Sequence, residues 1–126
     1  MSAGACDLVH YRALIESALV HTGGTHTFED VAALVASGDM RCWPAPHSII
    51  LTEIITYPRK RIGHVFLAAG NLAEIEAMTP VIIAWSKTQG CVGAQMWGRK
   101  GWERTFLTRT GWTPSLVLFG LDYGRQ

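Results

Sequence analysis

Residues 64–78 read HVFLAAGNLAEIEAM, and in this stretch a strand pattern passes into a helix pattern across a few small residues. The apolar run ends at AAGN (68–71), and helical spacing of the apolar positions begins at Leu72. The first N–H groups of a helix have no acceptor within the helix and attract anions. A strand, a tight turn and a helix in this order are therefore typical of a phosphate site, but they also form a plain chain reversal in a packed core.

The segment after the turn carries the clearest helix pattern of the chain. Within residues 72–89 one stripe holds the large apolar side chains: Leu72, Ile75, Met78, Ile82 and Trp85. Glu74 and Glu76 lie in the first turns, where acids complement the helix dipole and would repel a phosphate. Pro80 lies inside the pattern, so we expect a kink or a break there, and Gly90 should end the helix.

The segments before the turn have strand patterns. Residues 48–57 (SIILTEIITY) are rich in β-branched side chains and apolar on both faces, which is typical of a central strand. Residues 62–68 form a second strand, and the polar turn between the two (57–63) predicts an antiparallel hairpin. A short strand at 40–43 precedes them and should end at PAP (44–46).

Two helices are expected ahead of these strands. Residues 6–20 have helical spacing, with a stop at GG (23–24). The stretch from Thr27 to Asp30 resembles a capping box, and Gly38 stands where a glycine commonly ends a helix. The N-terminal third of the chain is therefore predicted to be helical.

Beyond the long helix, the pattern predicts a strand at 91–97 and a short helix at 102–110 that stops at Gly111. A last strand is expected at 115–121 (SLVLFGL). The resulting order is α-α-β-β-β-α-β-α-β, and it favours an α/β fold in which a mixed sheet carries helices on both faces.

The composition is that of one folded domain over residues 1–126, with 48% hydrophobic and 17% charged residues. A formal net charge of +1 argues against nucleic acid as a partner. The absence of a long apolar run or a secretory signal argues against a membrane partner and favours a cytoplasmic location. Cys6, Cys42 and Cys91 are odd in number and widely spaced, which favours reduced thiols over a disulfide.

The strand–turn–helix at 62–85 and the closing stretch GWERTFLTRTGW (101–112), in this element order, resemble the GCN5-related N-acetyltransferase (GNAT) superfamily. More narrowly, the chain is similar to short GNAT-like proteins of tailed bacteriophages. The resemblance covers roughly residues 48–121, and the family's usual first strand is not evident. It implies a single-domain GNAT-like mixed sheet, acetyl-CoA as the cofactor and an amine of unknown identity as the acceptor.

The resemblance also assigns cofactor-binding residues to the opening stretch. In GNAT proteins a splayed strand pairs with the pantetheine amides, and the corresponding residues are Val65, Phe66 and Leu67. The pyrophosphate loop and the helix start after it correspond to Ala69, Gly70, Asn71 and Leu72. The family's Q/R-x-x-G-x-G/A loop is shortened here, with one glycine and neither Gln nor Arg. Leu107 stands where the family has the Tyr that protonates the leaving thiolate.

Glu53 is the one charged residue within SIILTEIITY, on a face that otherwise carries apolar side chains. A two-residue turn at 59–60 would place Glu53 opposite Phe66 and diagonal to His64. A carboxylate among apolar neighbours has a raised pKa and can act as the catalytic general base for an amine, while His64 can relay a proton or partner Glu53. The plainer interpretations are a strand acid that is half solvated or paired with arginine, and a hydrogen-bonded filler histidine.

Two further functions stay open at the level of the sequence. The shortened loop and Leu107 favour a catalytically inert GNAT fold that serves as a phage virion or assembly protein. An inhibitor of a host protein would instead use exposed tryptophans, with Trp97 and Trp102 the expected ones, and the basic turn 59–61. The protein would then lie in the host cytoplasm or in the virion. The two histidines of HTGGTH (21–26) lack further ligands, so no metal is expected.

Overall fold

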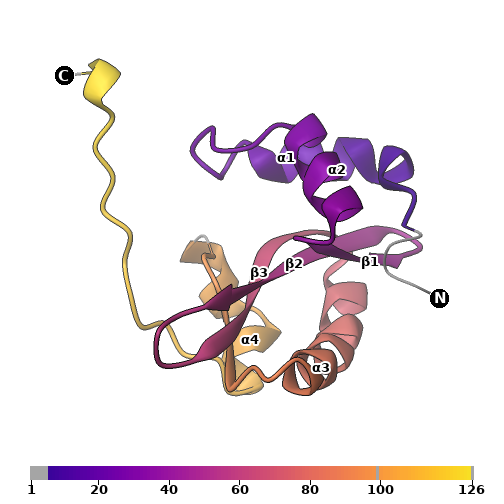
Figure 1. The fold of residues 1–126 in the computed structure, drawn as a ribbon, viewed down its shortest axis with the longest axis vertical. Coiled ribbons are helices and arrows are strands. Elements are labelled where there is room, and N and C mark those ends of the chain that lie inside the picture. The colour runs from indigo at the N-terminus through magenta and orange to yellow at the C-terminus, as the bar shows by residue number, and fades with distance from the viewer. Residues whose placement is uncertain (1–5, 99, 126) are drawn as a thin grey trace.

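The computed structural model describes residues 6–98 and 100–125, and Figure 1 shows how they are arranged. A four-stranded sheet lies between two layers of helices. In chain order the elements are a 3-10 helix (Leu8–Tyr11), α1 (Arg12–Leu19), α2 (Phe28–Ser37), β1 (Arg41–Ala45), β2 (Ser48–Thr56), β3 (Arg61–Gly70), α3 (Leu72–Thr88), β4 (Gly93–Met96), a second 3-10 helix (Lys100–Arg104), α4 (Phe106–Arg109) and a third 3-10 helix (Tyr123–Arg125).

Two apolar layers attach the helices to the sheet. On one face α1 and α2 bury Ile15 and Val31 against Leu51 of β2. On the other face α3 and α4 bury Ile82 and Phe106 in a cluster with Ile50 of β2. Because β2 contributes apolar side chains to both clusters, it is the central strand that its sequence predicted. The predicted α/β fold, a mixed sheet flanked by helices, is confirmed.

The sheet order is β1-β2-β3-β4, with the first three strands antiparallel and β4 parallel to β3. The predicted β2–β3 hairpin is confirmed, but its loop is longer than the predicted two residues. Thr56 pairs with Arg61, and the Tyr57 N–H donates to the carbonyl of Lys60 over 2.8 Å across the loop 57–60. This difference in loop length changes which residues face each other across the hairpin.

The ends of α2 are those that the sequence predicted. The Asp30 N–H donates to Thr27 Oγ1 over 3.1 Å, and the Thr27 N–H donates to Asp30 Oδ2 over 2.9 Å, which completes the capping box. The hydrogen bonds from Thr27 lower the pKa of Asp30. Gly38 ends the helix with φ of +87°, a conformation that glycine adopts at little cost.

Two element predictions are wrong, those for β1 and for residues 115–121. β1 continues through Pro44, which is tolerated because β1 is an edge strand and needs no N–H on its outer side. Of the kink or break expected at Pro80, the break does not occur: α3 is a single helix, because its packing on the sheet outweighs one lost helical hydrogen bond. Residues 115–121 form no strand, because no neighbouring strand pairs with them in the described part of the chain.

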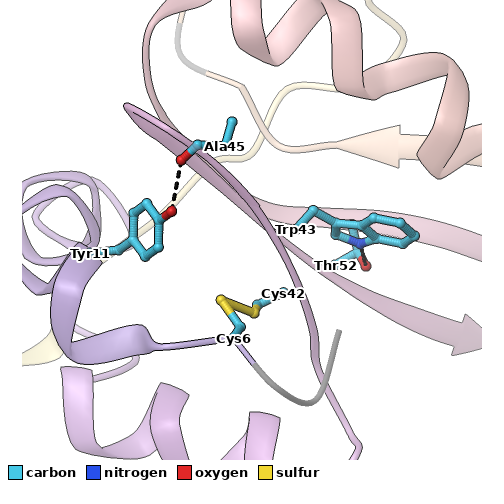
Figure 2. Close-up of a disulfide and its surroundings, with 6 residues drawn as sticks. All are labelled: Cys6, Tyr11, Cys42, Trp43, Ala45 and Thr52. Carbon is cyan, nitrogen blue, oxygen red and sulfur yellow. Dashed lines mark hydrogen bonds between the residues drawn. A yellow bond between two sulfur atoms is a disulfide. The ribbon is translucent and has the colours of Figure 1, made fainter. Parts of the chain in front are cut away.

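A disulfide joins Cys6 to Cys42 and so ties the segment before α1 to β1 (Figure 2). The prediction of reduced thiols is therefore wrong for this pair, because the fold brings together two residues that are 36 positions apart in sequence. Tyr11 strengthens the same connection, since its hydroxyl donates to the carbonyl of Ala45 over 2.7 Å. Cys91 is free and buried, as expected. Among the described residues no helix is both long and apolar enough to cross a bilayer.

Candidate functional site

β3 changes partners halfway along its length. It pairs with β4 from Ile62 to Val65, where Val65 faces Met96, and the pairing with β4 ends there. On its other side, the register with β2 shifts at the same point, because Val65 faces Thr52 whereas Leu67 faces Leu51. Phe66 is therefore an extra residue, and it forms a β-bulge.

Beyond the bulge, β3 continues to Gly70 with β2 as its only partner strand in the described residues. The main-chain groups on the β4 side of residues 66–69 therefore have no strand partner among the described residues, although Leu67 and Ala69 are themselves buried. Of the predicted pantetheine residues, Val65 is the last one paired with β4, Phe66 is the bulge, and Leu67 begins the open segment.

The turn after β3 is shaped by the start of β2. Gly70 has φ of +119°, and a Cβ atom added there would lie 2.6 Å from Ser48 Cα and collide with the backbone of His47. The Asn71 N–H donates to Ser48 Oγ over 2.8 Å. Gly70 is thus required by the close approach of the two strands, and the Asn71 N–H is already bonded within the protein.

The N-terminus of α3 is capped by its own preceding residue. Asn71 Oδ1 accepts a hydrogen bond from the Glu74 N–H over 3.0 Å. Leu72 and Ala73 are the first two residues of the helix, so their N–H groups have no acceptor within it. These two N–H groups are the anion-binding donors that the helix start offers.

The two glutamates near this helix start are both engaged by other groups. Glu74 accepts hydrogen bonds from the Ser48 hydroxyl over 2.6 Å and from the His47 N–H over 3.0 Å. Glu76 forms a two-pronged ion pair with Arg109 of α4, over 2.7 and 2.8 Å. The sequence argument that these acids would repel a phosphate is weakened, because neither carboxylate is left without a donor.

An open hollow lies beside the start of α3. It is lined by Leu72 of α3 and, from the segment around α4, by Arg104, Thr105, Phe106, Thr108 and Arg109. Two positive side chains therefore border the same hollow as the first residue of α3. A local anion site of this kind is compatible with the nearly neutral charge of the whole chain.

Glu53 of β2 and His64 of β3 lie in the part of the sheet before the bulge at Phe66. Glu53 faces His64 directly, so the prediction that it faces Phe66 is wrong, because the loop 57–60 is longer than assumed. Burial raises the pKa of Glu53, and the nearby His26 acts in the opposite direction. Burial lowers the pKa of His64, so its neutral form is favoured. In the described residues no ion pair joins the two side chains.

Three further segments meet this pair. Gln95 of β4 faces His64, and its Nε2 lies 3.4 Å from His64 Nδ1. The Trp97 ring lies 5.0 Å from the His64 ring, between centroids. From the loop between α1 and α2, His26 contacts the ring of Phe66 edge-on, with 4.6 Å between centroids. The bulge, the end of β4 and the α1–α2 loop thus converge around Glu53 and His64.

The sequence analysis missed His26 and Gln95 as neighbours of the site. The sequence pattern points to His26 only as a metal ligand, and no group of three or more potential ligands is found among the described residues. No local sequence signal points to Gln95, because it lies beside His64 only through the parallel pairing of β4 with β3. The prediction of an exposed Trp97 is confirmed at 76% exposure, whereas Trp102 is half-buried against the α3–α4 cluster.

No protein-family model and no curated protein sequence matches the chain. Solved structures do match over most of its length. A transcriptional regulator from Bacillus halodurans superposes with a TM-score of 0.71 at 12% identity, over 98% of this chain and 97% of its own. An acetyltransferase from Trypanosoma brucei superposes with a TM-score of 0.67 at 13% identity, over 92% of each chain.

The aminoglycoside N-acetyltransferase AAC(6')-Iy, solved in complex with CoA, superposes with a TM-score of 0.67 at 11% identity, over 92% of this chain and 88% of its own. The chain has the GNAT fold. At these identities the likeness concerns the GNAT fold alone, and the chemistry must be argued from this chain's own residues.

Proposed function

We propose that the chain binds acetyl-CoA and transfers its acetyl group to an amine. The observation that carries this proposal is the open edge of β3 beyond the bulge at Phe66, where β4 has ended but β3 continues to Gly70. An extended thioester cofactor with amide groups in its arm can pair with such an edge as a strand would. The CoA complex of one protein with the same fold supports this use of the fold.

The residues present fit the two ends of such a cofactor. The main chain of Val65, Phe66 and Leu67 would hold the arm. The turn formed by Ala69, Gly70, Asn71 and Leu72 would hold the pyrophosphate. Within this turn, the Leu72 and Ala73 N–H groups would be the donors, and Asn71 would act as the cap that orients them. Arg104 of the adjacent hollow would add positive charge for the same phosphates, whereas the charge of Arg109 is already paired with Glu76.

Glu53 would act as the catalytic base. Bound acetyl-CoA would supply the thioester carbonyl carbon that the amine nitrogen attacks. An amine reaches the site mainly as its ammonium form, so a group of this chain must first accept a proton. The raised pKa of Glu53 makes its carboxylate a better proton acceptor than an exposed glutamate. His64 would position Glu53 and the incoming amine as a neutral side chain beside Gln95.

One observation favours the alternative of a catalytically inert GNAT fold in a phage virion or its assembly. Leu107 is buried in the α3–α4 cluster and offers no hydroxyl where the family has its acid. In the enzymatic proposal the leaving sulfur must then take its proton from solvent. The further alternative, an inhibitor of a host protein, is favoured only by the exposed Trp97 and the basic residues 59–61.

Thermal unfolding in the presence of acetyl-CoA tests the enzymatic proposal against both alternatives. A ligand at 100 times its Kd stabilises the native state by about 2.7 kcal/mol, so we expect a clear rise in Tm. Leu72→Pro removes one of the two proposed N–H donors at a helix position that accepts proline, and the extended conformation of Asn71 suits a following proline. Leu72→Ala keeps the N–H and is the matched control.

We expect acetyl-CoA to bind Leu72→Pro at least about tenfold more weakly than Leu72→Ala, since a hydrogen bond to a charged group contributes about 1.5–3 kcal/mol. The absence of any Tm shift with wild-type protein at millimolar acetyl-CoA would rule out the enzymatic proposal. Equal affinities for the two variants would remove the start of α3 from the proposed site.

A further inference from the structure

One row of polar side chains crosses three strands of the sheet. Glu53 of β2 faces His64 of β3, and His64 in turn faces Gln95 of β4. Residues directly opposite on neighbouring strands carry their side chains on the same face, about 5 Å apart. His64 is the middle member of this row and is only 4% exposed, with the Trp97 ring packed against it. Its two ring nitrogens must therefore find partners in the row or in a bound ligand.

The Gln95 side-chain amide is held by two contacts. Its Nε2 lies 3.4 Å from His64 Nδ1 and 3.5 Å from the hydroxyl oxygen of Tyr57. An amide NH2 group has two hydrogens and accepts none, so it donates one hydrogen to each of these neighbours. Both donors of the amide are then used, which fixes its orientation at the edge of the sheet.

The contact with Gln95 determines where His64 carries its proton. Nδ1 can accept the Gln95 N–H only when it has no hydrogen of its own, which in the neutral ring places the hydrogen on Nε2. Burial lowers the pKa of His64, so the surroundings also favour the neutral ring. A reversed amide would instead accept a hydrogen bond from Nδ1–H, so the tautomer of His64 reports directly on this contact.

The second ring nitrogen of His64 is left as a donor that no protein group uses. Among the described residues Nε2 has no hydrogen-bond partner, and it is not one of the buried polar atoms that lack one, so it reaches the surface. Glu53 faces the same ring and forms no ion pair in the described part of the chain. An N–H donor and a carboxylate are therefore neighbours at the candidate site.

We propose that Gln95 is a positioning residue: it holds His64 as the Nε2–H tautomer, and this donor binds an oxygen atom of the acceptor amine. The preferred substrates would be amines with a hydrogen-bond-accepting oxygen a few bonds from the nitrogen, such as amino ethers or amino acid amides, because Glu53 and His64 are neighbours in the row. A purely hydrocarbon amine would leave this N–H without an acceptor, which weakens its binding. The substrate class rests on the proposed acetyl transfer, whereas the tautomer does not.

The ¹⁵N chemical shifts of the imidazole nitrogens, measured at neutral pH without acetyl-CoA, test the tautomer. The His64 signals are assigned by their loss in His64→Gln. We expect the Nε2–H tautomer in the wild type, and a proton on Nδ1 in Gln95→Glu, because a carboxylate only accepts. Gln95→Met, which has a similar length but no amide, should give a mixture of the two tautomers.

His26 is the internal control, because its Nδ1 contacts Thr25 Oγ1 at 2.7 Å and its signals should not change in the Gln95 variants. A wild-type His64 with its proton on Nδ1, or an unchanged Nε2–H tautomer in Gln95→Met, would overturn the role of Gln95. If either variant fails to fold, as judged by near-ultraviolet circular dichroism, the wild-type spectrum and the other variant still decide.

The substrate class is tested with 2-methoxyethylamine and n-butylamine, which differ by an ether oxygen in place of one CH2 group. For each amine kcat/KM is calculated per concentration of the uncharged form. The ratio of the two values should favour the ether about fivefold more in the wild type than in Gln95→Met. Equal ratios in the two proteins would overturn the substrate class. A wild type that acetylates neither amine would contradict the proposed function, and the ¹⁵N spectra would still confirm or refute the role of Gln95.

Discussion

Glu53 and His64 face each other across β2 and β3, and burial favours the neutral form of both side chains. For a carboxylic acid this means a raised pKa, and for a histidine a lowered one. Burial therefore makes the Glu53 carboxylate a stronger proton acceptor and makes His64 easier to keep neutral. The chemistry proposed for the site therefore depends on how far each side chain is withdrawn from water.

The role of Glu53 can be tested by Glu53→Gln. If Glu53 is the base, turnover should fall by about 100-fold or more while acetyl-CoA binding stays unchanged, because general-base catalysis contributes about that factor. The pH profile of the residual activity should lose its limb at acidic pH, where wild-type Glu53 becomes protonated. Steady-state kinetics with an excess of amine would measure this, and unchanged turnover across pH would remove Glu53 from the mechanism.

The same variant has a stability signature. The folded-state pKa of Glu53 lies above its unfolded value, so folding favours the protonated form. Its stabilising contribution is present at low pH and is lost as the pH rises through the folded pKa. We therefore expect Glu53→Gln to melt at a higher temperature than the wild type at neutral pH, and the difference to shrink in acid. A variant that is less stable at neutral pH would contradict the direction of this shift.

At the scale of elements, the close contact between the end of β3 and the start of β2 holds the turn before α3. Gly70→Ala introduces a methyl group 2.6 Å from Ser48 Cα and a side chain at φ of +119°. We expect this change to cost about 2 kcal/mol or more in the free energy of urea unfolding. Gly101→Ala is the control, since nothing lies within 4 Å of its added methyl group. Equal stabilities of the two variants would refute this account of the turn.

The elements themselves were largely predictable because their signals are local. The capping box at Thr27, the β-branched apolar run of β2 and the helical stripe after Asn71 each lie within one segment. The bulge at Phe66 was not predictable from its residue type, because it arises only when β3 pairs with β2 and β4 together. The predicted strand at 115–121 does not form for a related reason, since a strand needs a neighbouring strand to pair with as well as an apolar sequence pattern.

The candidate site was harder to predict than the fold. Glu53 and His64 were recognised as unusual, but their register depended on the loop 57–60, whose length the sequence did not determine. His26 and Gln95 come from distant segments and approach the pair only in the folded chain. The role of Glu53 is a prediction that Glu53→Gln tests directly.

At the scale of the whole molecule, the Cys6–Cys42 disulfide links the N-terminal segment to β1 across 36 positions. Closing a loop of this size stabilises a fold by about 3–4 kcal/mol through the unfolded chain. We expect Cys6→Ser with Cys42→Ser to lower the free energy of urea unfolding by about this amount. Reductant should lower the unfolding free energy of the wild type by a similar amount and leave that of the double variant unchanged. Identical unfolding of oxidised and reduced wild type would contradict this expectation.

We propose that acetyl-CoA binds where β3 and β4 part in this GNAT fold. The most direct measurement is an amide NMR titration of ¹⁵N-labelled protein with acetyl-CoA. We expect the largest changes in amide chemical shift at residues 66–69 and at Leu72 and Ala73, while the amides of α2 stay unchanged. The proposal would be contradicted if saturating acetyl-CoA left the chemical shifts of these amides unchanged, or if the changes fell on other residues instead.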